Sequence, residues 1–229
     1  MTRMFKFVKK TWNPCVGCEF YCKYCWAWRM ARRQKCEWCR LFRPHLHEER
    51  LNPKLLPKSG TVFVCDMGDI ACQHVLDVKA VLQFIESFQR GHETVFFFET
   101  KQPWFYITIF QRLTNLDPKK TILSATIETN REQITSQVSL APPPIQRYGG
   151  MEELDWPRKH VSVEPVMDFD PDVMFKWITD IEPELVSIGY DNYNNRLPEP
   201  PLQKVLKLIE DLENSGIRVE RKTLREARK

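Results

Sequence analysis

Four cysteines lie within a span of eleven positions near the start of this 229-residue chain, in the stretch TWNPCVGCEFYCKYCWAW (residues 11–28). They are Cys15, Cys18, Cys22 and Cys25. Close-spaced thiols form a disulfide framework, a zinc site or the cradle of an iron–sulfur cluster. Zinc sites with four cysteines usually separate two C-x2-C pairs by about 12–20 residues, whereas only three residues separate the pairs here. Because one short loop can wrap several corners of a cluster, the spacing favours iron and sulfur.

Cys18, Cys22 and Cys25 form C-x3-C-x2-C, which resembles the cluster-binding signature of the radical SAM superfamily. The wider sequence is similar to a phage- and prokaryote-associated radical SAM family of unknown function, which opens W-N-P-x-x-G-C and continues with C-x2-C. The further stretches that match this family are FRPHLHEERL (42–51), VCDMGDI (64–70), ETKQP (99–103) and SVEPV (162–166).

This resemblance implies a [4Fe–4S] cluster on the three cysteines and an open iron that binds S-adenosylmethionine (SAM). Reductive cleavage of SAM, with electrons from a flavodoxin- or ferredoxin-type donor, would give a 5′-deoxyadenosyl radical that takes hydrogen from an unidentified substrate. The residues implied to bind SAM are Tyr24, Asp66, Met67, Gly68, Asp69, Thr126, Glu128 and Asn130. The catalytic candidates implied to line the cavity are Lys101 and Glu164.

A second C-x2-C pair, Cys36 and Cys39, is followed closely by His45 and His47. Two thiols and two imidazoles of this kind can hold zinc. The pair could instead form a disulfide or ligate an auxiliary iron–sulfur cluster, with Cys15 or Cys72 as a further ligand. Alternatively, Cys36 and Cys39 are ordinary reduced thiols that pack as small apolar groups. The sequence leaves these interpretations open.

Short β-rich apolar runs alternate with helical patterns along the chain. The expected strands are 5–12, 61–66, 93–100, 121–128, 160–166, 184–190 and 217–221, and the expected loops are APPPIQRYGG (141–150) and NNRLPEPP (194–201). Strands that alternate with helices predict βαβ units and a parallel sheet. The fold class is therefore α/β, a partial (β/α)6-type TIM barrel that forms a single domain over residues 1–229. The cluster loop (15–25) and most of the polar candidates follow strands, where such barrels carry their chemistry.

The charge is unevenly distributed. Residues 1–50 hold 12 Lys and Arg against 4 Asp and Glu, and the basic C-terminal tail (218–229) holds 6 against 2. Basic ends suit an anionic substrate such as a nucleotide or a nucleic acid, which the enzyme would modify or repair, although they also occur as simple solvated surface. The chain shows neither a signal peptide nor a membrane-length apolar run, so we expect a cytoplasmic protein with no membrane partner.

An alternative comes from a different class of protein. If Cys15 closed the cluster as a fourth ligand, no iron would remain open for SAM. The protein would then be a non-catalytic iron–sulfur electron carrier or, with zinc in place of iron, a zinc-dependent nucleic-acid-binding module.

Overall fold

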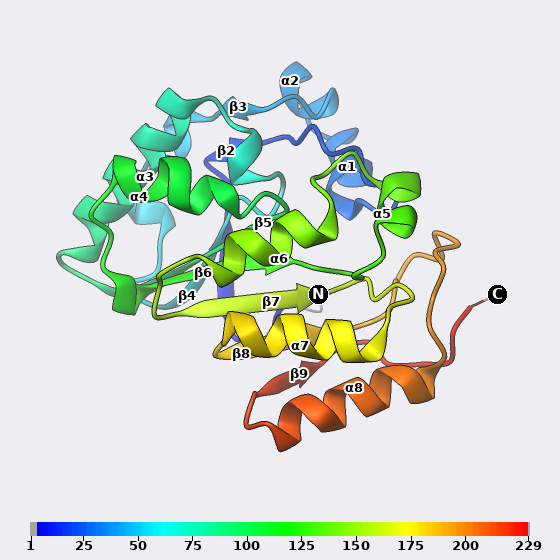
Figure 1. Ribbon diagram of the computed structural model, residues 1–229. Helices are drawn as coiled ribbons and strands as arrows, with labels where there is room; N and C mark the ends of the chain where they lie inside the picture. Colours follow the sequence, from blue (N-terminus) through cyan, green and yellow to red (C-terminus); the bar gives the residue numbers. More distant parts are fainter. Residues whose placement is uncertain (1–3, 229) are drawn as a thin grey trace. The chain divides into compact units, whose positions relative to one another are not determined.

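Seven of the β-rich runs form one sheet in the computed structural model, which describes residues 4–228 (Figure 1). Its strands are β1 (Val8–Trp12), β4 (Ser59–Val64), β5 (Glu93–Thr100), β6 (Thr121–Thr126), β7 (Lys159–Val163), β8 (Leu185–Ile188) and β9 (Val219–Arg221). The order in the sheet is β1-β4-β5-β6-β7-β8-β9, which follows the chain, and the strands run parallel. Each predicted strand is therefore confirmed, although several are shorter than expected. Two short segments that the sequence analysis did not identify, β2 (Cys15–Val16) and β3 (His45–Leu46), pair in antiparallel fashion.

Helices connect most of the parallel strands, as the alternating pattern predicts. They are α1 (Trp26–Ala31), α2 (Glu37–Arg40), α3 (Val75–Gln89), the π-helix η4 (Tyr106–Phe110), α4 (Gln111–Leu113), α5 (Glu132–Val138), α6 (Pro144–Glu152), α7 (Pro171–Ile181) and α8 (Leu202–Asn214). Short 3-10 turns are η1 (Glu48–Arg50), η2 (Pro53–Leu55), η3 (Ile70–Cys72) and η5 (Pro118–Lys120). One prediction is wrong: most of 141–150 is helix α6, because a proline at the first helical position favours a helix start.

The chain contains two compact units. Unit 1 comprises Met1–Glu19, Cys25–Thr100 and Phe105–Leu123, and unit 2 comprises Phe20–Tyr24, Lys101–Trp104 and Ser124–Lys229. The cluster loop contributes to both units, since its middle residues belong to unit 2. The expected single domain stays a prediction. Within residues 4–228, no helix has both the length and the apolar character needed to cross a membrane.

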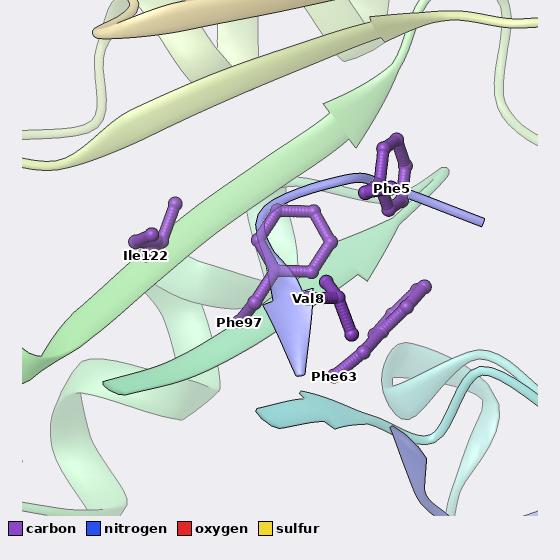
Figure 2. Packing of buried hydrophobic residues seen from close by; sticks show 5 residues of the cluster. All are labelled: Phe5, Val8, Phe63, Phe97 and Ile122. Atoms are coloured by element: carbon purple, nitrogen blue, oxygen red, sulfur yellow. The ribbon is translucent and has the colours of Figure 1, made fainter. Parts of the chain in front are cut away.

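The core of unit 1 lies between β1, β4 and β5. Phe5 and Val8 pack against Phe63, Phe97 and Ile122, all at most 4% exposed (Figure 2). The rings of Phe63 and Phe97 meet edge to face with their centroids 4.9 Å apart, which is a favourable aromatic geometry. This aromatic core holds the strands whose carboxyl ends carry the polar loops described below.

Unit 2 is built from the β7–β8–β9 strands with helices α7 and α8. Apolar residues of α8 recur at helical spacing and are buried: Val205, Leu208, Ile209 and Leu212. The same pattern on α7 buries Met174, Trp177, Ile178 and Ile181. These stripes are the faces that amphipathic helices bury in a domain core. The segment 194–201 has no regular structure, as predicted.

Candidate functional site

The Trp-Asn-Pro stretch at the end of β1 is hydrogen-bonded to two later segments of unit 1, the loop after β4 and the turn that contains Arg50. Asn13 donates from Nδ2 to Asp66 Oδ1 at 2.5 Å and accepts at Oδ1 from the Met67 N–H at 2.9 Å. Arg50 donates to the Asn13 carbonyl oxygen at 2.8 Å, and its own carbonyl oxygen accepts from the Trp12 indole N–H at 2.9 Å. The side chain of Asn13 therefore fixes the loop after β4 against the start of the cysteine loop.

Two glycines allow the cysteine loop to approach the loop after β4. The Gly17 N–H donates to the Met67 carbonyl oxygen at 3.1 Å, and the Asp69 N–H donates to the Gly17 carbonyl oxygen at 3.3 Å. A Cβ atom on Gly68 would lie 2.6 Å from the Gly17 oxygen, and Gly17 itself has a φ of +99°. Such an approach and such a φ are readily available only to glycine. Cys18, the first residue of the C-x3-C-x2-C motif, directly follows Gly17.

The two carboxyl groups of the segment 66–69 have different surroundings. Asp69 is 5% exposed and accepts from the Ala71 N–H at 2.9 Å and from the Thr100 hydroxyl at 2.6 Å. Burial raises the pKa of Asp66, and hydrogen bonds from Asn13 and from Thr11 oppose the rise. Asp69 thus fixes the loop, whereas Asp66 is a partly buried carboxyl that a cation would help to ionise.

None of the three cysteines of the C-x3-C-x2-C motif forms a disulfide with another described residue. In unit 1, Cys18 and Cys25 are partly exposed and pack with Met67 against an apolar cluster at α1. In unit 2, Cys22 is buried, with its Sγ 3.1 Å from the Ser139 Oγ. This donor set fits an iron–sulfur cluster, because the ligands of these clusters are thiolates that no disulfide consumes.

The second pair of cysteines lies with two histidines in unit 1. We call this group the Cys36–His47 cluster, and its members are Cys36, Cys39, His45 and His47. Cys15 is outside this cluster, fully buried on β2 and hydrogen-bonded to Cys65. Cys72 lies elsewhere in unit 1, with its Sγ 3.8 Å from that of Cys18.

A buried ionic cluster in unit 2 contains three residues predicted from the sequence and one that was missed. Glu128 accepts from the Tyr24 hydroxyl, from the Lys101 ammonium and, at 2.5 Å, from the guanidinium of Arg147. Burial by itself raises the pKa of Glu128, but Arg147 and Lys101 outweigh it and lower that pKa to about 2. Burial raises the pKa of Tyr24 well above its usual value. Arg147, on α6, was missed because its stretch was interpreted as a loop.

Two further candidates are Thr126, the last residue of β6, and Asn130, on the loop that follows β6. Thr126 is 6% exposed, and its carbonyl oxygen accepts from Arg147 at 3.2 Å. Asn130 accepts from the Asp170 N–H at 2.8 Å and donates to the Asp170 carboxylate at 3.2 Å. The amide of Asn130 therefore links this loop to the start of α7. The assignment of both residues to SAM stays a prediction.

Glu164 pairs with Lys222, a partner that no sequence signal indicated. Their side chains are 17% and 11% exposed. Burial raises the pKa of Glu164, and the Lys222 ammonium opposes the rise. Two arginines of the basic tail are also paired with glutamates, Arg221 with Glu213 and Arg225 with Glu199. Much of the positive charge of this tail is therefore balanced within unit 2; its last residue, Lys229, lies outside the described residues.

The chain belongs to the family described as "Protein of unknown function (DUF5131)", whose model matches residues 2–179. No curated protein matches the chain significantly.

Solved structures share the fold at low sequence identity. SuiB of Streptococcus suis, bound to its precursor peptide SuiA, is 10% identical with a TM-score of 0.62, over 95% of this chain and 49% of SuiB. A spore photoproduct lyase variant bound to a dinucleoside spore photoproduct is 11% identical with a TM-score of 0.55, over 87% and 59% of the two chains. Methylornithine synthase (PylB) is 10% identical with a TM-score of 0.55, over 93% and 71%.

This chain therefore spans about half the length of the SuiB chain. The shared fold is α/β, the partial TIM barrel of these radical SAM neighbours, and the predicted fold class is confirmed.

Proposed function

We propose that this protein is a radical SAM enzyme that binds a [4Fe–4S] cluster through Cys18, Cys22 and Cys25. The observation that carries the proposal is the C-x3-C-x2-C motif, whose cysteines form no disulfide among the described residues, on a loop that precedes α1 in a chain with the partial TIM-barrel fold. Cysteine thiolates are the ligands of such clusters. Loops that follow the barrel strands are also where this fold class carries its chemistry.

When bound, the cluster and SAM supply one-electron cleavage of the sulfonium bond and a 5′-deoxyadenosyl radical that abstracts hydrogen. The electron donor is of the flavodoxin or ferredoxin type. The chain's own residues bind and orient the cofactors. Asp66, held by Asn13, suits the amino group of SAM, because an ammonium group would favour the charged carboxylate. Gly17 and Gly68 bring this loop to the first cysteine.

Unit 2 contains a buried polar cluster of its own. The carboxylate of Glu128 is bonded to Tyr24, Lys101 and Arg147, so Lys101 helps to position Glu128 and Tyr24. The Arg147 Nη2 is a buried donor without an acceptor among the described residues, which suits a bound acceptor group. Glu164 is the better candidate for holding a proton, since burial favours its neutral form.

Removal of single motif thiols tests the cluster assignment. Cys18→Ala, Cys22→Ala and Cys25→Ala proteins, reconstituted anaerobically with iron and sulfide, should lose most of their iron and form no 5′-deoxyadenosine from SAM and a chemical reductant. The matched control is Cys65→Ala, which removes a buried thiol outside the motif. A Cys22→Ala protein with the iron content and SAM cleavage of the parent would overturn the proposal.

We further propose that the substrate is a nucleotide or a nucleic acid, which the enzyme modifies or repairs. Exposed indoles and cations alternate over residues 26–43 of unit 1. The Arg32 guanidinium lies 4.6 Å from the ring of Trp28, and that of Arg43 lies 5.8 Å from the ring of Trp38. The two indoles are 42% and 53% exposed. Stacking surfaces between cations are typical of proteins that bind single strands. One structural neighbour, spore photoproduct lyase, is bound to a dinucleoside photoproduct.

Binding of fluorescent single-stranded DNA and RNA at increasing salt tests this substrate class. Affinity should fall as salt rises, because phosphate contacts release counterions. Arg32→Gln should weaken binding and flatten the salt dependence, whereas Lys79→Gln, an exposed cation on α3, should change neither. Absence of binding at low salt would overturn this substrate class and favour a peptide, as in the structure of SuiB with SuiA.

A further inference from the structure

The Cys36–His47 cluster places four metal-binding atoms around one point in unit 1. All four atoms lie within 4.8 Å of one another. The Cys39 Sγ is 3.4 Å from the His45 Nε2 and 3.1 Å from the His47 Nε2, and the Cys36 Sγ is 3.7 Å from the His45 Nε2. In a tetrahedral zinc site with bonds of about 2.0–2.3 Å, neighbouring ligand atoms lie roughly 3.3–3.8 Å apart. The cluster therefore has the size of a site for a single ion.

The outer nitrogen of each histidine fixes the ring so that the inner nitrogen can bind a cation. The His45 Nδ1 is 2.8 Å from the Arg43 carbonyl oxygen, and the His47 Nδ1 is 2.9 Å from the Glu49 carboxylate. Both partners only accept hydrogen bonds, so each Nδ1 carries the proton. Both Nε2 lone pairs then face each other at 2.9 Å. A cation between them removes this repulsion, and carbonyl or carboxylate partners at the outer nitrogen are typical of metal-bound histidines.

The donor set and its arrangement favour zinc over an auxiliary iron–sulfur cluster. Two thiolates and two imidazoles are a common ligand set of structural zinc. In a two-iron cluster of this composition, the histidines ligate one iron and the cysteines the other, which would separate the two pairs. Here the cysteine pair and the histidine pair are not separated. The Cys39 Sγ is closer to the Nε2 atoms of both histidines than the Cys36 Sγ is to the His45 Nε2.

The local secondary structure brings the ligands together from a short stretch of sequence. Cys36 precedes helix α2 and Cys39 is its third residue, so one turn carries both thiols. His45 and His47 are two residues apart in extended backbone, which places both rings on one face. This stretch buries Cys39 and Phe42 but leaves much apolar surface in contact with solvent, since Trp38 and Leu41 are more than half exposed. Small segments without a core of their own commonly depend on a metal.

The antiparallel pair of β2 and β3, which we call the β2–β3 ribbon, contains the start of the cysteine loop and the cluster residue His45. The β2 residues Cys15 and Val16 pair with Leu46 and His45 of β3. The Cys18 N–H also donates to the Phe42 carbonyl oxygen at 3.2 Å, which lies between the two ligand pairs in sequence. An ion that ties α2 to β3 therefore stabilises the backbone that enters the C-x3-C-x2-C motif.

We propose that Cys36, Cys39, His45 and His47 bind one structural zinc ion that fastens α2 to the β2–β3 ribbon. The metal content of the intact chain tests this site. The parent protein, purified without added metal, should hold about one zinc ion per chain, as a closed structural site does. Cys39→Ser and His47→Asn should lose the zinc and melt at a lower temperature. The matched controls Cys65→Ala and His74→Ala should keep the zinc.

A second measurement does not depend on the folding of these variants. Parent protein stripped by a chelator should bind Co²⁺ at this site and develop the absorption of a tetrahedral cobalt–thiolate site. Glu49→Gln should weaken the binding by about 10-fold or more, since it alters the partner of a ligating histidine. Cys22→Ala should keep its zinc, so that failure of the iron–sulfur proposal leaves this result unaffected. A Cys36–Cys39 disulfide in the native protein, or a stripped protein that shows no cobalt–thiolate absorption, would overturn the proposal.

Discussion

The buried pair of Glu128 and Arg147 gives the sharpest prediction for stability. Both side chains are fully buried, and Lys101 is the second cation on the same carboxylate. The two cations overcome the effect of burial and lower the pKa of Glu128 from 4.5 to about 2. At 1.36 kcal/mol per pKa unit, this corresponds to about 3 kcal/mol of net stabilisation of the charged carboxylate. Breaking a buried ion pair by removing one partner costs about 3–5 kcal/mol. We therefore expect Arg147→Met to lower the free energy of unfolding by about 3 kcal/mol at pH 7.

The same pair predicts how this loss depends on pH. Because the folded-state pKa of Glu128 lies below its unfolded value, the stabilisation is fully present above about pH 4.5 and is lost as the pH falls toward 2. The parent protein should therefore lose stability over this range through Glu128. In Arg147→Met the folded-state pKa of Glu128 is lowered less. The difference in free energy of unfolding between the variant and the parent should therefore become smaller below about pH 4.5.

Urea unfolding followed by tryptophan fluorescence, under anaerobic reducing conditions, measures both effects. The matched control is Arg158→Met, which breaks a pair with Glu184 whose side chains are 29% and 35% exposed. Exposed pairs contribute about 1 kcal/mol or less. The double variant Glu128→Met, Arg147→Met should recover much of the loss, since apolar residues of similar volume can replace a buried pair. Two results would refute the reasoning. One is an equal loss of unfolding free energy in Arg147→Met and Arg158→Met at pH 7. The other is a difference in unfolding free energy between Arg147→Met and the parent that is the same at pH 3 as at pH 7.

Two predictions concern the loop that carries the motif. Gly17→Ala should destabilise the protein by about 2 kcal/mol or more, because the new Cβ would lie 2.2 Å from the Arg43 carbonyl oxygen at a φ of +99°. Gly91→Ala, where no atom lies within 4 Å, is its control, and equal urea midpoints for the two variants would contradict the prediction. Asn13→Ala should cost about 1–3 kcal/mol by leaving the partly buried Asp66 without its amide donor; an unchanged free energy of unfolding would show that the hydrogen bonds of Asn13 to Asp66 and Met67 do not stabilise the protein.

The parallel sheet could be predicted from the sequence because its strands are buried. The run 93–100 has four consecutive apolar residues at its centre, and such runs together with the alternating helices identify the fold class. Helix α6 could not be predicted in the same way. Its proline-rich start has the composition of a loop, and its buried residues include Arg147, which carries no apolar signal.

The candidate site was predictable where the ligands are close in sequence. The spacing of Cys18, Cys22 and Cys25 predicts a cluster motif, and the C-x2-C pair before two histidines made a second metal site one of the interpretations that the sequence left open. Partners distant in sequence were not predictable: Lys222 is 58 residues from Glu164, and only the folded chain brings them together. Cys15, one possible further ligand of the second site, lies on β2 with its side chain buried outside the Cys36–His47 cluster, and its role stays a prediction.

The central claim is that Cys18, Cys22 and Cys25 bind a cluster with an iron left open for SAM. The most direct measurement is the EPR spectrum of the anaerobically reconstituted and reduced protein, recorded with and without SAM. An open iron that chelates the amino and carboxylate groups of SAM predicts a clear change in the spectrum of the reduced cluster. A cluster closed by a fourth cysteine, as in an electron carrier, would give the same spectrum in both samples and would contradict the claim.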